Sequence, residues 1–385
     1  MTGKLRILQV IKTLDISGAE RYGVELARFL TKLGCDVEIC GFFKSGSPLE
    51  AYWQQQLQSE HIINFSVAPW KGNNHFLSYL IGIKNLREHL KQKPVDIIHS
   101  HFQLGTLVGL DLRRQRLTRC AVRTAHNHRR NEWATNLYGW LCYKLIGGWL
   151  YPTQLDAETA VSAAIVDELS QTWGSRFSYR QPVLIYNGIS PDLITQANAI
   201  PRLKINQGKF SIGSIGRLTP QKDYATLLQA IHLASSELKG LEFELVGDGE
   251  LRSTLEEQRQ KLNLESIVHF RGRQNNVIEY LRRWDLFILP SLWEGLPTVV
   301  LESMCCQTPI LATDIPGTRE IIIPGKTGWL VPPGDPIAMA NHLIQILKLS
   351  EVERSTITKN ALIELQKFTY PNIAAQLLSL YHQIL

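Results

Sequence analysis

The chain has 385 residues, enough for about two domains that each bury a core. Its apolar fraction of 44% and charged fraction of 20% are those of a soluble globular protein, and no uncharged stretch is long enough to make a membrane span. We do not expect secretion, because charged and amide side chains interrupt the apolar residues of the N-terminal segment MTGKLRILQVIKTLD.

The net charge of +6 is unevenly distributed. Residues 1–190 carry 22 Lys and Arg against 15 Asp and Glu, whereas residues 191–385 carry 19 against 20. A basic half suggests an anionic partner: a nucleic acid, an acidic membrane surface or a phosphorylated acceptor. Nucleic acid is the least favoured of the three, because no nucleic-acid-binding motif accompanies the charge.

The cysteines are spread thinly, without C-x-x-C or metal-ligand spacing. We therefore expect reduced core thiols in a cytoplasmic protein. The six are Cys35, Cys40, Cys120, Cys142, Cys305 and Cys306.

The first strand is predicted over residues 4–12, a β-rich apolar run. Ser17 is a candidate cap for the helix that follows, and Gly34 ends it. Apolar residues recur in it at helical spacing: Val24, Ala27, Leu30 and Leu33. Gly18 lies at this strand-to-helix turn, which tolerates a phosphate, although the dinucleotide fingerprint G-x-G-x-x-G is absent.

Strands are next predicted over 36–43 and 95–101, with a helix over 76–92 between them. This alternation indicates a parallel sheet. His99 and His101 alternate at the end of the later strand; two histidines make a poor metal site, so we expect them to line the wall of a site.

Arginines then crowd the chain at Arg113, Arg114, Arg116, Arg119, Arg123, Arg129 and Arg130. Among them a strand ends at His126, with His128 just beyond. The segment 132–151 is rich in Trp and Tyr and contains Lys144. It suits either a membrane interface or a core helix, and apolar residues nearly all round favour the core. The next strand–helix unit is expected over 156–169.

A polar linker over 196–209 precedes a second series of strands and helices. The strand 210–215 runs into Gly216, and Arg217 and Lys222 follow before a helix from Asp223. Two cations at a helix-opening loop suit a diphosphate, because each offers charge-assisted hydrogen bonds. We expect both to face solvent.

A buried strand is predicted over 285–290 and a helix from Pro297 to about Gln307. Free N–H groups in the first turn of that helix make an anion site beneath the loop SLWEG. Glu294 lies in this loop and Glu302 two turns along the helix, so a carboxylate stands where open α/β sheets bind ligands.

The segment EGLPTVVLE matches the E-x7-E motif of retaining GT-B glycosyltransferases, and nearly the whole chain resembles glycosyltransferase family 4. The resemblance implies an α/β fold of two doubly wound, Rossmann-like domains facing across a cleft. We expect an acceptor-side domain over 1–190, a nucleotide-sugar-binding domain over 191–370, and a C-terminal helix, 371–385, that returns to the first domain.

The resemblance also implies roles for individual residues. Glu294 and His126 would contact the donor sugar, Glu302 the ribose, and Arg217 and Lys222 the diphosphate. Further donor-binding candidates are Gly18, Gly272, Arg273, Gly295, Leu296, Pro297 and Thr298, with Glu20 and Glu320 as weaker ones.

The sequence departs from the family pattern at two points. Ser17 replaces the first Gly of the family's Gly-Gly-x-Glu loop, so that only Gly18 carries over. Asp223 replaces the last Gly of Gly-Arg-Leu-x-x-x-Lys-Gly.

The implied reaction is transfer of a hexosyl group, with retention, from a nucleotide diphosphate sugar to a hydroxyl of a glycan or lipid-linked acceptor. No Asp-x-Asp occurs, so we expect no metal, and no cofactor because the donor is a substrate. The protein would be cytoplasmic and could sit on the inner face of an anionic membrane. Alternatives are a nucleotide-sugar epimerase or nucleotide phosphorylase of this fold, or a non-catalytic sugar-nucleotide-binding scaffold.

Overall fold

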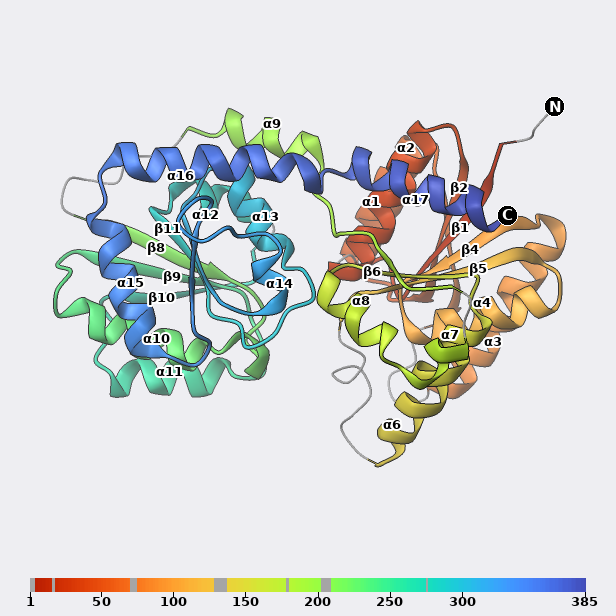
Figure 1. Cartoon of the computed structure of the whole chain (residues 1–385), viewed down its shortest axis with the longest axis horizontal. Coiled ribbons are helices and arrows are strands. Elements are labelled where there is room, and N and C mark those ends of the chain that lie inside the picture. Colours follow the sequence, from red (N-terminus) through yellow and green to blue (C-terminus); the bar gives the residue numbers. More distant parts are fainter. Residues whose placement is uncertain are drawn as a thin grey trace. The chain divides into compact units, whose positions relative to one another are not determined.

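The computed structural model describes residues 4–15, 18–69, 75–127, 137–177, 180–201, 209–274 and 276–385. The chain divides into two compact units (Figure 1). Unit 1 comprises Met1–Gly188 together with Tyr370–Leu385, and unit 2 comprises Ile189–Thr369.

Unit 1 is built on a seven-stranded parallel sheet in the order β3-β2-β1-β4-β5-β6-β7. Its five inner strands are nearly all buried, as expected for a sheet covered on both faces, whereas the edge strands β3 and β7 are mostly only partly buried. They are β1 (Arg6–Ile11), β2 (Asp36–Lys44), β3 (Ile63–Pro69), β4 (Val95–Ser100), β5 (Thr118–Ala125), β6 (Ala157–Ala160) and β7 (Val183–Leu184).

Helices cover both faces of this sheet (Figure 1). On one face lie α1 (Gly18–Lys32), α2 (Pro48–Ser59) and α17 (Tyr370–Ile384); on the other lie α3 (His75–Gln92) and α4 (Gln103–Arg114). The remaining helices are α6 (Leu137–Cys142), a π-helical segment (Tyr143–Leu150), α7 (Tyr151–Gln154), α8 (Ala163–Ser170) and a 3-10 turn (Trp173–Phe177).

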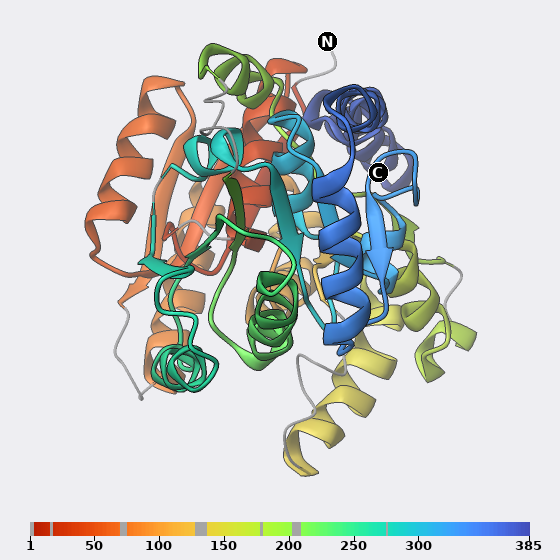
Figure 2. The same ribbon diagram turned by 90° about the vertical axis from the view of Figure 1, so that its left-hand side faces the viewer.

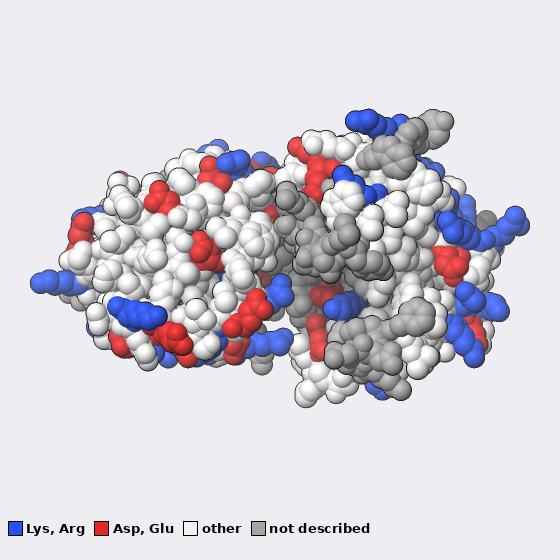
Figure 3. Space-filling model, turned by 90° about the horizontal axis from the view of Figure 1, so that it is seen from below, with Lys and Arg blue, Asp and Glu red and all other residues white. Residues whose placement is uncertain are grey.

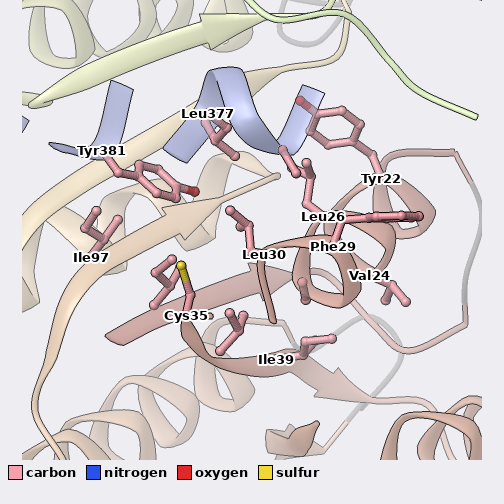
Figure 4. Close-up of a cluster of buried hydrophobic side chains, with 14 of the residues drawn as sticks. Tyr22, Val24, Leu26, Phe29, Leu30, Cys35, Ile39, Ile97, Leu377 and Tyr381 are labelled. Atoms are coloured by element: carbon pink, nitrogen blue, oxygen red, sulfur yellow. The ribbon is translucent and has the colours of Figure 1, made fainter. Parts of the chain in front are cut away.

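Helix α17 returns to unit 1 from the end of unit 2 and packs against α1. Figure 4 shows Leu377 and Tyr381 of α17 facing Leu26 and Leu30 of α1 above the strands. All four side chains are buried, so residues from the far end of the sequence complete this core.

Unit 2 has a six-stranded parallel sheet in the order β10-β9-β8-β11-β12-β13. The strands are β8 (Phe210–Ile215), β9 (Leu241–Val246), β10 (Val268–Gly272), β11 (Leu286–Leu289), β12 (Ile310–Thr313) and β13 (Trp329–Val331).

One face of the unit 2 sheet is covered by α10 (Tyr224–Ser235), α11 (Arg252–Lys261) and α15 (Pro336–Lys348). Figure 2 shows these helices side by side in the order α11, α10, α15. The other face carries α9 (Pro191–Ala199), α12 (Val277–Arg283), α13 (Thr298–Cys305) and α16 (Glu351–Glu364). The short helix α14 (Pro316–Arg319) and 3-10 turns at Pro220–Lys222 and Leu365–Phe368 complete the unit.

Each sheet reverses its strand order beside its first strand. In unit 1 the reversal falls between β1 and β4, and in unit 2 between β8 and β11. The connections on either side of such a point run to opposite faces, so the loops part and leave a crevice at the carboxyl ends of the strands. The fold therefore predicts one ligand-binding edge in each unit, at the carboxyl ends of the strands beside the reversal.

Trp284 secures the reversal point of unit 2. Its ring is fully buried, and it lies against Gly213 of β8, where an added Cβ would come within 2.2 Å of the ring. Its indole N–H donates to Glu244 of β9 at 2.9 Å. The guanidinium of Arg283 and the Trp284 N–H, with Arg271 beside them, hold the pKa of Glu244 below its usual value against the effect of burial. These contacts fix the strands that frame the crevice.

The predicted fold class, two doubly wound α/β domains, is confirmed, and the predicted strands and helices fall within a few residues of those observed. Two expectations are wrong. Leu33 is 47% exposed, because α1 ends at Lys32 before its apolar stripe reaches that position. The described part of 132–151 is not a core helix, since four of its large apolar side chains are more than 40% exposed: Trp140, Leu141, Leu145 and Trp149.

The described cysteines are all free, and five of the six are buried. In the described parts of the chain, no helix combines the length and the apolar character needed to cross a bilayer.

Candidate functional site

The site in unit 2 begins with the loop between β8 and α10. A 3-10 turn over Pro220–Lys222 brings the chain to Asp223, whose backbone is left-handed, with φ 43° and ψ 46°. Glycine adopts this conformation most easily, and Asp tolerates it better than most residues. The Asp223 carboxylate also caps α10 by accepting from the Thr226 N–H at 3.4 Å. Asp223 therefore serves where the resembled family has glycine.

Lys222 and Glu294 form an ion pair at the reversal point. Lys222 Nζ lies 2.5 Å from Glu294 Oε1, and the Ser291 hydroxyl donates to the same oxygen at 2.7 Å. Gln221 Nε2 donates to Glu294 Oε2 at 3.3 Å. The two ionised side chains are only 14% and 10% exposed, so the pair is largely withdrawn from solvent. A cation from the loop after β8 thus meets a carboxylate from the loop after β11.

The expectation that both cations face solvent is wrong for Lys222. Its aliphatic stem lies against Gly216, where an added Cβ would come within 3.1 Å of Lys222 Cε. A glycine at 216 leaves room for the stem, which then turns inward to Glu294. Arg217 differs: it is exposed, and its guanidinium has no partner among the described residues.

The second half of the loop between β11 and α13 is buried and closely packed, whereas Leu292 and Trp293 before it are exposed. Gly295, Leu296 and Pro297 are buried, and α13 begins at Thr298, one residue later than predicted. Gly317 of α14 lies beneath the loop, where an added Cβ would be 2.5 Å from the Gly295 carbonyl oxygen. This packing holds the first turn of α13 next to Glu294. The Val300 N–H bonds to the Pro297 carbonyl oxygen at 3.1 Å, and no described residue accepts from the N–H groups of Thr298 and Val299.

Other candidate residues of unit 2 lie along the same strand edge. Glu302 is 6% exposed on α13. Gly272 ends β10 in a left-handed conformation with φ 65°, and Arg273 follows it, exposed. Glu320 follows α14 and is half-buried. Since β8, β10 and β11 are parallel, their end loops share one edge.

In unit 1, His126 follows the end of β5. Its Nε2 lies 3.3 Å from His101 Nδ1, and the ring of Tyr22 meets it edge-on at 5.2 Å between centroids. Tyr22 belongs to α1, which begins at Gly18 with φ 23°. Gly18 and His126 thus lie at the ligand edge nominated for this unit. Ser17, His128, Arg129 and Arg130 lie outside the described residues.

His99 and His101 are interior groups, so the expectation that they line a site wall is wrong. They are 0% and 5% exposed. Burial lowers the pKa of His99 to about 3 and holds the pKa of His101 well below its usual value. Burial and the charge of Arg123 lower the pKa of His126 as well. All three rings are therefore neutral at pH 7.

Several side chains of the two edges were not predicted from the sequence. Gln221 and Ser291, which hold Glu294, stand beside the motif but carry no signal of their own. Gln9 and Tyr381 bond to the histidines from β1 and α17. No group of three potential metal-ligating side chains occurs among the residues that the structure describes.

The unit 2 edge is chemically suited to a ligand that is anionic at one end and hydroxylated at the other. Arg217, Lys222 and the start of α13 offer positive charge and N–H donors, whereas Glu294 accepts hydrogen bonds. Residues 16–193 match the family model described as Glycosyltransferase Family 4, and residues 195–362 match the model described as Glycosyl transferases group 1. The chain belongs to glycosyltransferase family 4.

The relatives of this glycosyltransferase include the putative glycosyltransferase EpsF of Bacillus subtilis, 28% identical over 80% of this chain and 79% of that one. The UDP-Gal:alpha-D-GlcNAc-diphosphoundecaprenol alpha-1,3-galactosyltransferase of Escherichia coli is 25% identical over 89% and 88%. Anabaena HepE, solved with UDP and glucose, superposes with a TM-score of 0.79 over 98% of this chain and all of that one, at 20% identity. The predicted GT-B fold is thereby confirmed.

The buried histidines make the stability of this glycosyltransferase sensitive to acid. Below about pH 6.5, the usual histidine pKa, His99 binds a proton in the unfolded chain. In the folded protein, where its pKa is about 3, it stays unprotonated to much lower pH. Stability should therefore fall as the pH drops from 7, by about 2 kcal/mol for one such histidine at pH 5. Urea unfolding at several pH values measures this change.

His99→Gln is the matched variant, because an amide can still bond to Thr124 and Tyr381 but does not titrate. Its stability should fall less steeply between pH 7 and pH 5 than that of the parent. Equal slopes would show that His99 is not held neutral.

Proposed function

We propose that this glycosyltransferase moves a hexosyl group, with retention at the anomeric carbon, from a nucleotide diphosphate sugar to a hydroxyl of a glycan or lipid-linked acceptor. The observation that carries the proposal is the largely buried Lys222–Glu294 ion pair beside the start of α13, with exposed Arg217 on the same loop as Lys222. The names of the relatives agree with it: a UDP-galactose donor and a diphosphoundecaprenol-linked acceptor in one, and UDP with glucose bound in another.

Departure of the nucleoside diphosphate is the demanding step, since negative charge grows on its oxygens. Arg217, Lys222 and the N–H groups at the start of α13 would stabilise that charge. Lys222 has three N–H donors and needs only one for Glu294, so it can hold a phosphate oxygen at the same time. The ion pair with Glu294 fixes the orientation of the Lys222 ammonium before the donor binds. Less conformational entropy of the Lys222 side chain is then lost on binding.

The remaining contacts follow the family pattern. Glu294 and His126 would bind the sugar, Glu302 the ribose, and Gly272 and Arg273 the base. Gly18, Gly295, Leu296, Pro297 and Thr298 would bring backbone close to the donor. The nucleoside of the donor would be uridine or guanosine.

No divalent metal is needed in this proposal. Two side-chain cations and a helix terminus take the part that a metal takes where an Asp-x-Asp motif holds one, and that motif is absent from the sequence. The donor is a substrate, so no cofactor is required, and we place the enzyme in the cytoplasm.

We also propose that unit 1 binds anionic membranes. The segment from Trp140 to Trp149 exposes four large apolar side chains, and Lys144 lies 6.0 Å from the centre of the Trp140 ring. Such a mixture suits the headgroup region. Arg114, Arg116 and Arg119 are exposed around an open pocket of about 460 Å³ in the same unit, and Figure 3 shows Lys and Arg side chains gathered at that unit's right-hand end.

Not every arginine of the crowded segment is available to lipid. Arg123 is buried and paired with Glu158 at 2.7 Å, and Arg113 is paired with Asp156. The electrostatic part of the membrane proposal therefore rests on Arg114, Arg116 and Lys144, together with Arg119, whose side chain is 61% exposed although its guanidinium lies 3.5 Å from Asp96.

Replacing Arg217 by Ala should lower turnover by two to three orders of magnitude, about the loss caused by removing one charge-stabilising donor. The fold should survive, because Arg217 is exposed. Release of nucleoside diphosphate from a panel of UDP and GDP sugars measures turnover, and the anomeric proton signals of the product report retention.

Lys209→Ala is the control for that variant, since Lys209 is an exposed cation at the opposite end of β8, paired with Glu242. It should behave as the parent. Unaltered turnover of Arg217→Ala would remove the diphosphate role, and a panel with neither binding nor release would favour a non-catalytic scaffold.

Activity should persist in excess chelator. The assay is the same nucleoside diphosphate release, with and without EDTA. A loss that magnesium or manganese restores would contradict the argument from protein cations.

The full-length protein should float with vesicles that contain about one-third phosphatidylserine and not with neutral vesicles, and added salt should release it. Each cation near an acidic leaflet contributes about 1 kcal/mol, so a few acting together give reversible binding. The double change Trp140→Ser and Leu145→Ser should reduce the recovery.

Leu233→Ser is the control in flotation, because Leu233 is a comparably exposed leucine of α10 in unit 2. Equal recovery with neutral and acidic vesicles, or binding that ignores salt, would defeat the electrostatic membrane proposal. The arginines would then serve a soluble, phosphorylated acceptor.

A further inference from the structure

A continuous chain of hydrogen bonds runs through the interior of unit 1 and ends at His126. It passes through side chains of four strands, the loops that follow two of them, and the returning helix. In order, its members are His126, His101, Gln9, Tyr381, His99, Thr124 and Thr159. Six of the seven are buried, and His126 is partly exposed.

Gln9 gives the chain its direction. Its Oε1 lies 2.7 Å from His101 Nε2, and an amide oxygen can only accept. His101 therefore carries its proton on Nε2, because a neutral ring has only one N–H. Its Nδ1 is left with a lone pair, which accepts from His126 Nε2 at 3.3 Å. His126 in turn must carry its proton on Nε2.

From the amide nitrogen of Gln9, the hydrogen bonds continue in the same direction. Its Nε2 donates to the Tyr381 oxygen at 3.4 Å, so the Tyr381 O–H is free to donate to His99 Nδ1 at 2.6 Å. His99 Nε2–H then donates to the Thr124 hydroxyl at 2.7 Å. Thr124 donates to Thr159 at 2.8 Å, and Thr159 to the Arg123 carbonyl oxygen at 3.4 Å.

Each hydrogen in this arrangement is used once and each ring stays neutral. Neutrality fits the surroundings. Arg123, which directly precedes Thr124 in the sequence, forms an ion pair with Glu158. The tyrosines beside the histidines, Tyr22 and Tyr381, are buried, and burial raises their pKa values. A chain of buried bonds that all point one way is mutually strengthening, so its members hold one another's orientation.

We propose that this chain fixes His126 as the Nε2–H tautomer, so that its Nδ1 lone pair accepts a hydroxyl hydrogen of the donor sugar. No described residue bonds to that nitrogen. His126 is then a hydrogen-bond acceptor and not a proton donor in the reaction. Gln9 and Tyr381 are positioning residues that act through His101. The inference rests on the proposed function insofar as it assigns the sugar to His126.

The direction depends on Tyr381, because its oxygen is the acceptor that holds the Gln9 amide in place. In Tyr381→Phe that acceptor is lost, and Gln9 can rotate its amide by half a turn. His101 Nε2 would then accept, His101 Nδ1–H would donate, and the proton of His126 would shift to Nδ1. Tyr381→Phe should therefore mix the two tautomers of His126.

Nitrogen NMR of the full-length protein with ¹⁵N-labelled histidine tests this at pH 7, because protonated and unprotonated ring nitrogens have well-separated shifts. The parent should show His126 protonated on Nε2 alone, and Tyr381→Phe should move both His126 nitrogens toward the average. Tyr370→Phe makes the same change on the same helix, at a residue outside this series of hydrogen bonds. It should leave the protonation pattern of His126 as in the parent.

Three results would each overturn the proposal that the hydrogen bonds fix the tautomer of His126. They are a proton on Nδ1 of His126 in the parent, a charged His126 ring at pH 7, and an unaltered nitrogen pattern in Tyr381→Phe. Kinetics separate this from the proposed function. Tyr381→Phe should lower kcat/KM for the donor about tenfold, the effect of one misdirected hydrogen bond, without changing KM for the acceptor. The expected NMR pattern with undiminished kcat/KM in His126→Ala would refute only the acceptor role toward the sugar.

Discussion

The reversal of strand order in each sheet is the constraint on which the other features depend. Parallel strands joined by right-handed crossovers must place their helices on opposite faces on either side of the first strand, so the loops part there. Unit 2 fills that opening with the Lys222–Glu294 pair, and unit 1 fills it with Gln9 and the histidines. The same geometric consequence of chain handedness thus selects both sets of polar residues.

Much of this could be predicted from the sequence because the signals are local. Buried strands, helix caps and turn glycines can each be recognised within a few residues of sequence. The E-x7-E segment likewise predicts both the loop and the helix in which its glutamates lie. The resemblance then gave the family and fold, which the family models and the topology confirm. Departures from the family pattern were also readable, and Asp223 shows why one is tolerated: its backbone takes the left-handed conformation of the glycine that it replaces.

The rest could not be predicted, because it depends on which distant residues share the interior. Nothing near Gln9 indicates a partner 372 residues away on α17, and two alternating histidines look alike in sequence whether they line a site or lie beneath it. Lys222 seemed solvent-facing because lysines usually are, and its inward turn depends on Glu294, 72 residues later, and on Gly216. The segment from Trp140 to Trp149 is apolar enough for a core, yet four of its large apolar side chains lie exposed.

The return of α17 to unit 1 makes that unit discontinuous along the chain. During synthesis, residues up to Gly188 leave the ribosome long before Tyr370–Leu385 exist. Until then the face of α1 that receives Leu377 and Tyr381 is uncovered, and His99 lacks its phenol partner. Unit 2, a continuous stretch, has all its residues before unit 1 gains α17, its last helix. The first half of this protein to be made is therefore the last that can reach its native packing, and it must pass the interval with an apolar surface open to other chains.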